Sequence, residues 1–126
     1  MQTAFRRLLT NASAVTALVP ASRIEWARVG QGAALPSIAL HLIGHSPGLT
    51  LGASDGFWQG RVQVDVYGAT YASAKAVADA LVSLLHGHKG DGFQLISFDS
   101  QRDNFETAAA DRPCRISLDF LTIWSE

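Results

Sequence analysis

The chain has few cysteines, no long apolar segment and no secretory signal. Cys114 is the single cysteine among 126 residues, which excludes an internal disulfide and favours synthesis in a reducing compartment. No apolar run approaches the ~18 residues that a membrane helix needs, and the N-terminal segment lacks the apolar stretch of a secretory signal. We therefore expect no membrane contact and a soluble protein made in the cytoplasm, which stays there or in something assembled there.

Charge is also scarce. Only 17% of the residues are charged, and ten basic and eleven acidic side chains, scattered without runs, leave a net charge of −1. Without a basic stripe to neutralise phosphates, we do not expect specific binding of nucleic acid. Because 48% of the residues are apolar, the low charge also suggests that some apolar surface is covered only in an assembly.

The stretch Gly60–His86 organises the rest of the chain, which has the length of one domain and shows no internal repeat. Its first part alternates valines with polar residues, the pattern of a half-buried strand. From Thr70 the apolar residues recur at helical spacing, with Thr70 as the N-cap and Gly87 just past the C-terminus. A strand that leads directly into a helix places the apolar faces of both against one core.

The same patterns predict the other elements. Pro20 ends a first helix, and alternation marks the later strands. We expect a helix at Thr3–Val19, a short extended piece at Ile24–Trp26, and strands at Ser37–Ile43, Phe93–Phe98 and Cys114–Trp124. This order predicts an α+β domain over residues 1–126, with a largely antiparallel sheet of four to five strands and two helices packed on one face.

Two polar segments are predicted to be long loops. Gly44–Trp58 is rich in glycine, serine and proline, and Asp99–Asp111 is mostly polar. Both carry isolated aromatic or apolar residues that need cover, and loops of this length are usually functional. We expect these loops to contact other proteins.

The residues offer no catalytic or metal-binding constellation. His41 and His45 share a face of the expected strand but lie about 13 Å apart along it, and no second pair of ligands stands at metal spacing. Solvated loop histidines explain the pattern better. Cys114 begins an alternating strand as a buried small hydrophobe. The segment Gly87–Gly92 follows a helix instead of opening one, unlike a phosphate loop. We predict no enzyme, no cofactor and no metal.

Charged residues also alternate along two expected strands. Arg61 and Asp65 lie on one face of the first, and Arg115 and Asp119 on one face of the second. The two aspartates could pair, but a salt-bridged outer face, or a face against a partner, is the simpler interpretation.

Four segments in order resemble a known family: Gln31–Pro36, Gly60–Lys75, Phe98–Asp103 and Arg115–Phe120. Their succession and spacing are similar to the tail completion or tail terminator proteins of long-tailed bacteriophages and of phage-derived gene transfer agents. The likeness covers nearly the whole chain, although each segment by itself is modest.

The resemblance implies a structural virion protein at the junction of head and tail. Such proteins form a ring, usually hexameric, that ends polymerisation of the tail tube protein and presents a surface to the head connector protein, while DNA passes through the lumen without being read. A near-neutral chain suits that passage, since strong positive charge would retard DNA. The expected contacts with neighbouring subunits or with the tube are Leu49, Leu51, Phe57, Trp58, Arg102, Asp103 and Phe105.

Two alternatives remain at this stage. A neighbouring head-tail connector protein of the same particle would share the size and the loops. A small-molecule-binding α+β domain would need a concave apolar pocket with converging polar groups, which the scattered polar positions do not suggest.

Overall fold

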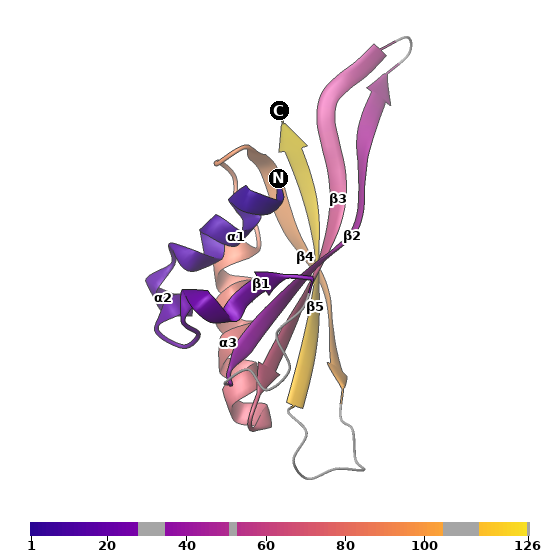
Figure 1. Cartoon of the computed structure of the whole chain (residues 1–126). Helices are drawn as coiled ribbons and strands as arrows, with labels where there is room; N and C mark the ends of the chain where they lie inside the picture. Colours follow the sequence, from indigo (N-terminus) through magenta and orange to yellow (C-terminus); the bar gives the residue numbers. More distant parts are fainter. Residues whose placement is uncertain (28–34, 51–52, 105–113, 126) are drawn as a thin grey trace.

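A five-stranded sheet covered by helices on one face makes up the fold (Figure 1). The structure, a computed structural model, describes residues 1–27, 35–50, 53–104 and 114–125. The elements are α1 (Gln2–Thr10), α2 (Ser13–Thr16), a 3-10 turn η1 (Ala21–Arg23), β1 (Ile24–Trp26), β2 (Ser37–Thr50), β3 (Ala53–Gly68), α3 (Tyr71–Leu85), β4 (Phe93–Asn104) and β5 (Cys114–Ser125).

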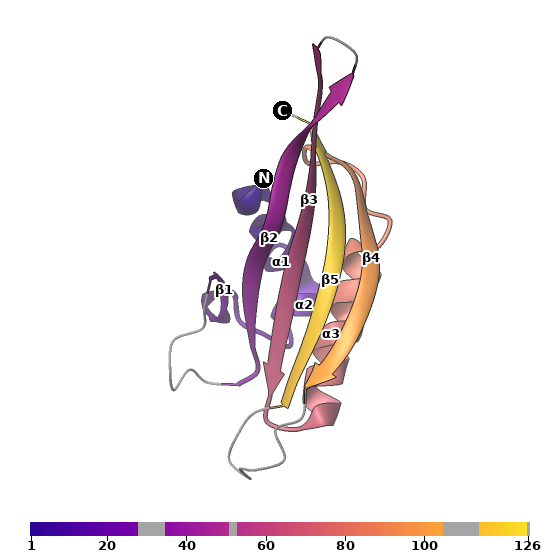
Figure 2. The same cartoon turned by 90° about the vertical axis from the view of Figure 1, so that its right-hand side faces the viewer.

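The strand order across the sheet is β1-β2-β3-β5-β4 (Figure 2). Only β1 and β2 run parallel, and the other three pairings are antiparallel. The predicted α+β class is confirmed, as are the number of strands and the single helical face. No helix or strand of the described residues covers the other face of the sheet, which is called the open face here.

The core lies between α3 and the sheet, as the central stretch predicts. Val62, Val64 and Val66 are fully buried in β3, and the apolar stripe of α3 packs on them in a core that also includes side chains of α1 and the other strands. The hydroxyl of Thr70 accepts a hydrogen bond from the Ser73 amide, so Thr70 is the N-cap. The strand and helix therefore form one packing unit.

The first helix is shorter than predicted. The periodic pattern runs from Thr3 to Val19, but α1 ends at Thr10 and the chain turns at Asn11 before α2 begins. Asparagine and serine compete for backbone hydrogen bonds and interrupt helices. Val15 and Val19 are nonetheless fully buried, because the apolar spacing survives the break.

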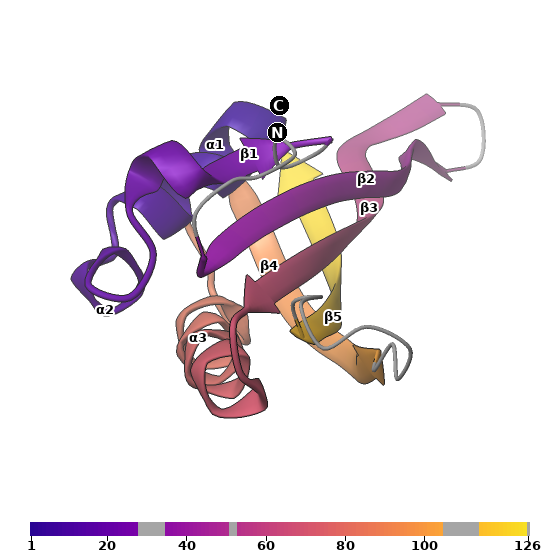
Figure 3. The ribbon, with the colours of Figure 1, turned by 60° about the horizontal axis from the view of Figure 1, so that its bottom comes forward.

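The predicted loop at Gly44–Trp58 is wrong, because most of this segment is paired strand. β2 continues to Thr50 and β3 begins at Ala53, with the ladder passing two irregularities, between Leu42 and Gly44 and between Pro47 and Leu49. Bulges and edge positions accommodate glycine and proline within strands. Residues 46–50 and 53–58, here called the arm, project beyond the rest of the sheet and lean away from the helices (Figures 1 and 3).

The second predicted loop is also strand in its first part. β4 extends to Asn104 and pairs with β5 beyond a bulge between Phe98 and Ser100. The polar composition of this part of β4 suggests a loop. Its polar side chains instead form hydrogen bonds within the subunit, for example those of Ser100 and Arg102 with Asp119. The remainder of the segment, 105–113, lies outside the described residues.

We predict that Gly92→Ala destabilises the fold more than Gly87→Ala. Both glycines have positive φ, of 90° and 80°, but a Cβ at Gly92 would lie 2.4 Å from the Trp124 ring whereas a Cβ at Gly87 meets open space. Backbone strain should cost each variant about 1–2 kcal/mol, and the clash should add about 1–3 kcal/mol at Gly92 alone. Urea unfolding followed by circular dichroism measures both, and equal losses would contradict the contact with Trp124.

Candidate contact surfaces

The arm exposes apolar side chains on a narrow support. Phe57 is 39% exposed, and Ile43, at the base of the arm, is 56% exposed. The pairing of β3 with β5 ends at Phe57, so beyond that point the arm consists of two strands. Two-stranded hairpins are marginally stable by themselves in water. An exposed arm of this kind is suited to packing against another protein.

An aromatic pair stiffens the base of the arm. Trp58 stacks on His45, with ring centroids 4.9 Å apart. The expectation that His41 and His45 share a face is wrong: the bulge after Leu42 places His41 opposite Gln63 on the open face and His45 opposite Gly60 on the other side. His45 is therefore a strand residue packed on a tryptophan, not a solvated loop residue.

The open face carries an ionic cluster around Asp119. This residue is only 6% exposed, and its carboxylate accepts hydrogen bonds from the Arg102 guanidinium and from the Ser100 hydroxyl. Arg61 approaches Asp119 at 3.6 Å and binds Asp99 at 2.9 Å. The hydrogen bond to Asp119 raises the pKa of Arg102 above its ordinary value. β3, β4 and β5 are thus joined by one cluster.

A second cluster surrounds Asp65, which is 3% exposed. Its carboxylate accepts hydrogen bonds from the Ser117 hydroxyl at 2.7 Å and from the Gln63 amide at 2.9 Å, and it lies 3.1 Å from His41. Asp65 and Asp119 do not pair with each other, because the register sets Asp65 opposite Ser117. The predicted salt-bridged outer face is present, and its aspartates are more deeply buried than an outer face implies.

The predicted contact residues fall at two separate ends of the sheet. Phe57 pairs with Ser125 and Arg102 pairs with Ser117, positions on β5 that lie about 26 Å apart at ~3.3 Å per residue. The structure brings Phe57 and Trp58 together in the arm, but not with Arg102. The predicted residues thus form two groups.

The second group is held within the subunit. Arg102 binds Asp119, and Asp103 accepts a hydrogen bond from the hydroxyl of Tyr71 at the start of α3. That hydrogen bond raises the pKa of Tyr71 above its ordinary value. Both residues therefore fasten β4 within the subunit.

Leu49 belongs to β2 within the arm. Leu51 and Phe105 lie outside the described residues. Cys114, expected to be buried, is half-buried at the start of β5.

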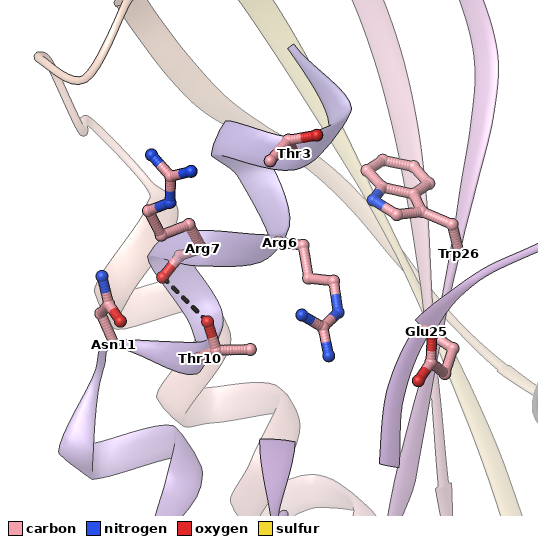
Figure 4. A pocket seen from close by; sticks show the side chains of 7 residues that line it. All are labelled: Thr3, Arg6, Arg7, Thr10, Asn11, Glu25 and Trp26. Atoms are coloured by element: carbon pink, nitrogen blue, oxygen red, sulfur yellow. Dashed lines mark hydrogen bonds between the residues drawn. The ribbon is translucent and has the colours of Figure 1, made fainter. Parts of the chain in front are cut away.

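Two hollows beside α1 form a surface that the sequence analysis missed. The hollow between α1 and β1 measures about 850 Å³, and the one between α1 and α3 about 240 Å³. Arg7 and Asn11 line both hollows. Figure 4 shows Arg7 on α1, Asn11 just after its C-terminal end, and Trp26 on β1. The helical periodicity of the sequence identifies the buried residues of α1. It does not indicate where hollows lie beside the exposed residues of the helix.

The order of elements, the long β2–β3 hairpin and the open face can now be compared with known proteins. A family model described as tail completion protein gp17 matches residues 3–125. The chain belongs to this tail completion family. No curated protein matches the chain by sequence.

Solved structures share the fold of this tail completion chain. One is a chain of the virion of a native gene transfer agent particle, with a TM-score of 0.73 and 20% identity over 100% of this chain and 95% of that one. A second solved chain has a TM-score of 0.62 and 17% identity over 99% of this chain and 93% of its own length. At such identities the likeness concerns the fold.

Family membership makes the chain a structural protein of a phage-type tail, which locates it in the virion and in an assembly with other tail proteins. The predicted family is thereby confirmed. In the part of the chain that the structure describes, no helix is long and apolar enough to span a membrane. The surfaces of interest in a tail completion protein are those that meet other proteins.

We predict that Asp119→Ala destabilises the fold far more than Asp79→Ala. Asp119 is nearly buried and binds Arg102 and Ser100, so its loss should cost about 2–3 kcal/mol as charged hydrogen bonds disappear. Asp79 forms an exposed pair with Lys75 one helical turn away, worth about 0.3–0.5 kcal/mol. Thermal and urea unfolding provide the comparison, and similar losses would show that the open-face cluster contributes little to stability.

Proposed function

We propose that this protein forms a hexameric ring at the head-proximal end of the tail tube. The ring ends polymerisation of the tube protein and joins the tail to the head connector. Membership of the tail completion family supports this role. The single structural observation that carries it is the arm, an exposed hairpin that projects from the subunit on the side away from the helices (Figure 1).

The arm suits a ring because it gives the subunit two different contact surfaces on opposite sides. A closed ring needs a heterologous interface, in which one surface of a subunit meets a different surface of the next. The arm supplies an apolar projection, and the helical layer supplies a separate surface on the other side. Among the predicted contacts, Leu49, Phe57 and Trp58 belong to the arm and serve as intersubunit or tube contacts. Leu51 remains a predicted contact outside the described residues.

The second group of predicted contacts lies near the other end of the sheet. Arg102, Asp103 and Phe105 fall on β4 and the segment after it, where a different partner can be met. Because Arg102 and Asp103 are bound within the subunit, their contribution is to hold this end in shape. Phe105 remains a predicted contact outside the described residues.

Passage of DNA through the ring is the remaining part of the proposal. The chain is nearly neutral, and on the open face Arg61 and Arg102 are each bound to an aspartate. Cations that are already neutralised attract phosphates weakly. DNA can therefore pass without being retained or read.

The test is the mass of the purified protein by light scattering over a concentration series, followed by addition of tail tube protein. We expect a ring-sized species, or assembly confined to tube ends that shortens the tubes seen by electron microscopy. A protein that stays monomeric and ignores tubes would contradict the proposal. Binding to head proteins without binding to tubes would favour a connector instead.

We predict that Phe57→Ser weakens this assembly by about tenfold or more, since exposed aromatic side chains dominate interface energies. Leu121→Ser is the matched control, because Leu121 is 38% exposed and Phe57 is 39% exposed, but Leu121 lies opposite Arg61 in the body of the sheet, outside the arm. Light scattering of both variants at equal concentrations measures the difference. Equal behaviour of the two variants would remove the arm from the interface.

A further inference from the structure

Aromatic side chains form a continuous path from the arm, through the core, to α1 and β1. They come from β2, β3, β5, β4, α1 and β1, one from each element. The set is called the aromatic chain here and consists, in order, of His45, Trp58, Trp124, Phe93, Phe5 and Trp26. No two successive members are neighbours in the sequence. The aromatic chain therefore joins segments that no local interaction connects.

The outer half of the aromatic chain crosses the sheet at the base of the arm. Trp58 stacks on His45 with 4.9 Å between the ring centroids, and it pairs with Trp124 in the β3–β5 register. Side chains directly opposite each other on antiparallel strands have Cβ atoms about 4.5–5.5 Å apart and interact. The Trp124 ring then meets the Phe93 ring at a centroid distance of 4.9 Å, edge to face. These contacts connect the arm to β4.

The inner half of the aromatic chain connects β4 to the N-terminal helix. Phe93 lies 6.2 Å from Phe5, and Phe5 lies 6.0 Å from Trp26, measured between ring centroids. Tilted and edge-on pairs at about 4.5–7 Å attract each other beyond their apolar burial. The path from the arm to β1 is therefore made of favourable contacts throughout.

The aromatic chain has a buried middle and accessible ends. Phe5 is 0% exposed and Phe93 is 2% exposed, whereas Trp58 and Trp26 are half-buried. Trp58 belongs to the arm, and Trp26 lines the larger hollow, between α1 and β1 (Figure 4). The aromatic chain thus connects two separate surfaces of the subunit across its core.

The helix at the inner end depends on this packing. α1 spans only Gln2–Thr10, and isolated helices of fewer than about 12 residues are at best marginal in water. It is held by the burial of Phe5 and Leu9 and by a hydrogen bond from the Trp26 indole to the Gln2 carbonyl oxygen at 3.1 Å. Opening of such an element costs less than global unfolding. A change in the packing around Phe5 therefore alters how often α1 detaches.

We propose that the aromatic chain couples the arm to the docking of α1, so that a contact which fixes the arm also tightens α1 against β1. A partner that immobilises Trp58 restricts Trp124 and then Phe93, and Phe5 packs against a more ordered site. Such coupling is reciprocal, because a partner in the larger hollow would equally steady the arm. The inference rests on the proposed use of the arm as a contact. It adds that occupation of the arm prepares the surface of α1 for a further partner.

The first test removes the ring at the arm end. Trp58→Leu should raise the hydrogen exchange rate of the α1 amides about two- to tenfold, which corresponds to the energy of one aromatic contact. Phe98→Leu is the matched control, because it removes a half-buried ring whose aromatic contact, with Phe120, lies outside the aromatic chain. Mass spectrometry measures exchange in residues 2–10, and circular dichroism verifies that both variants are folded. Equal exchange of α1 in the two variants would overturn the inference.

A double-mutant cycle provides the sharper test. Phe93→Leu interrupts the aromatic chain at its buried middle, so adding Trp58→Leu should not raise α1 exchange further. In a Phe98→Leu background the effect of Trp58→Leu should remain, because independent sites are additive. Trp124→Leu removes the adjacent ring and replaces Phe93→Leu if that variant does not fold. An effect of Trp58→Leu that is as large with Phe93→Leu as without it would overturn the inference.

These measurements separate the inference from the function on which it rests, since they use the protein by itself and need neither a ring nor a tube. Coupled variants of a protein that neither self-associates nor assembles on tube ends would overturn the ring and leave the aromatic chain. A protein that forms rings, but in which Trp58→Leu leaves α1 exchange unchanged, would overturn the aromatic chain alone. Assembly that slows α1 exchange equally in the wild type and in Phe93→Leu would also overturn it.

Discussion

The pairing of β3 with both β2 and β5 is the constraint on which the rest of the structure depends. β3 pairs with β2 from Ala53 to Tyr67 and with β5 from Phe57 to Gly68. Its alternation sends Val62, Val64 and Val66 into the core and Asp65 to the open face. The core, the ionic clusters and the arm are therefore parts of one ladder, and a one-residue slip would exchange its two faces.

The same ladder explains how a small domain can expose a contact arm without losing its fold. The lower part of β3 has a paired strand on each side and the helical layer over one face, so Val62, Val64 and Val66 are fully buried. The upper part loses β5 beyond Phe57, and Phe57 is exposed. Stability thus resides in the body of the sheet, and the arm is free to be stabilised by a partner. A tail protein that assembles with others can thus keep a stable sheet and still offer an exposed arm for contact.

Burial of charged groups on the open face follows from cross-strand geometry. Asp65 and Asp119 lie in the middle strands, where neighbouring side chains from both sides close over them. Because each carboxylate receives hydrogen bonds from at least two side chains, its burial is compensated. The face therefore holds these buried carboxylates without a covering layer of described residues. Arg61 and Arg102 on this face are each bound to an aspartate.

The sequence by itself determined the features that depend on local periodicity and capping: the strand through Val62–Val66, the helix that begins after Thr70, and the α+β order of elements. It also carried the family resemblance. Only the tertiary structure decided that Gly44–Trp58 is a paired arm, because bulges hide strand pairing behind glycine and proline. It alone set His41 beside Asp65, and it alone placed Arg7 between two hollows. Such relations depend on register and packing between distant segments, which local periodicity does not specify.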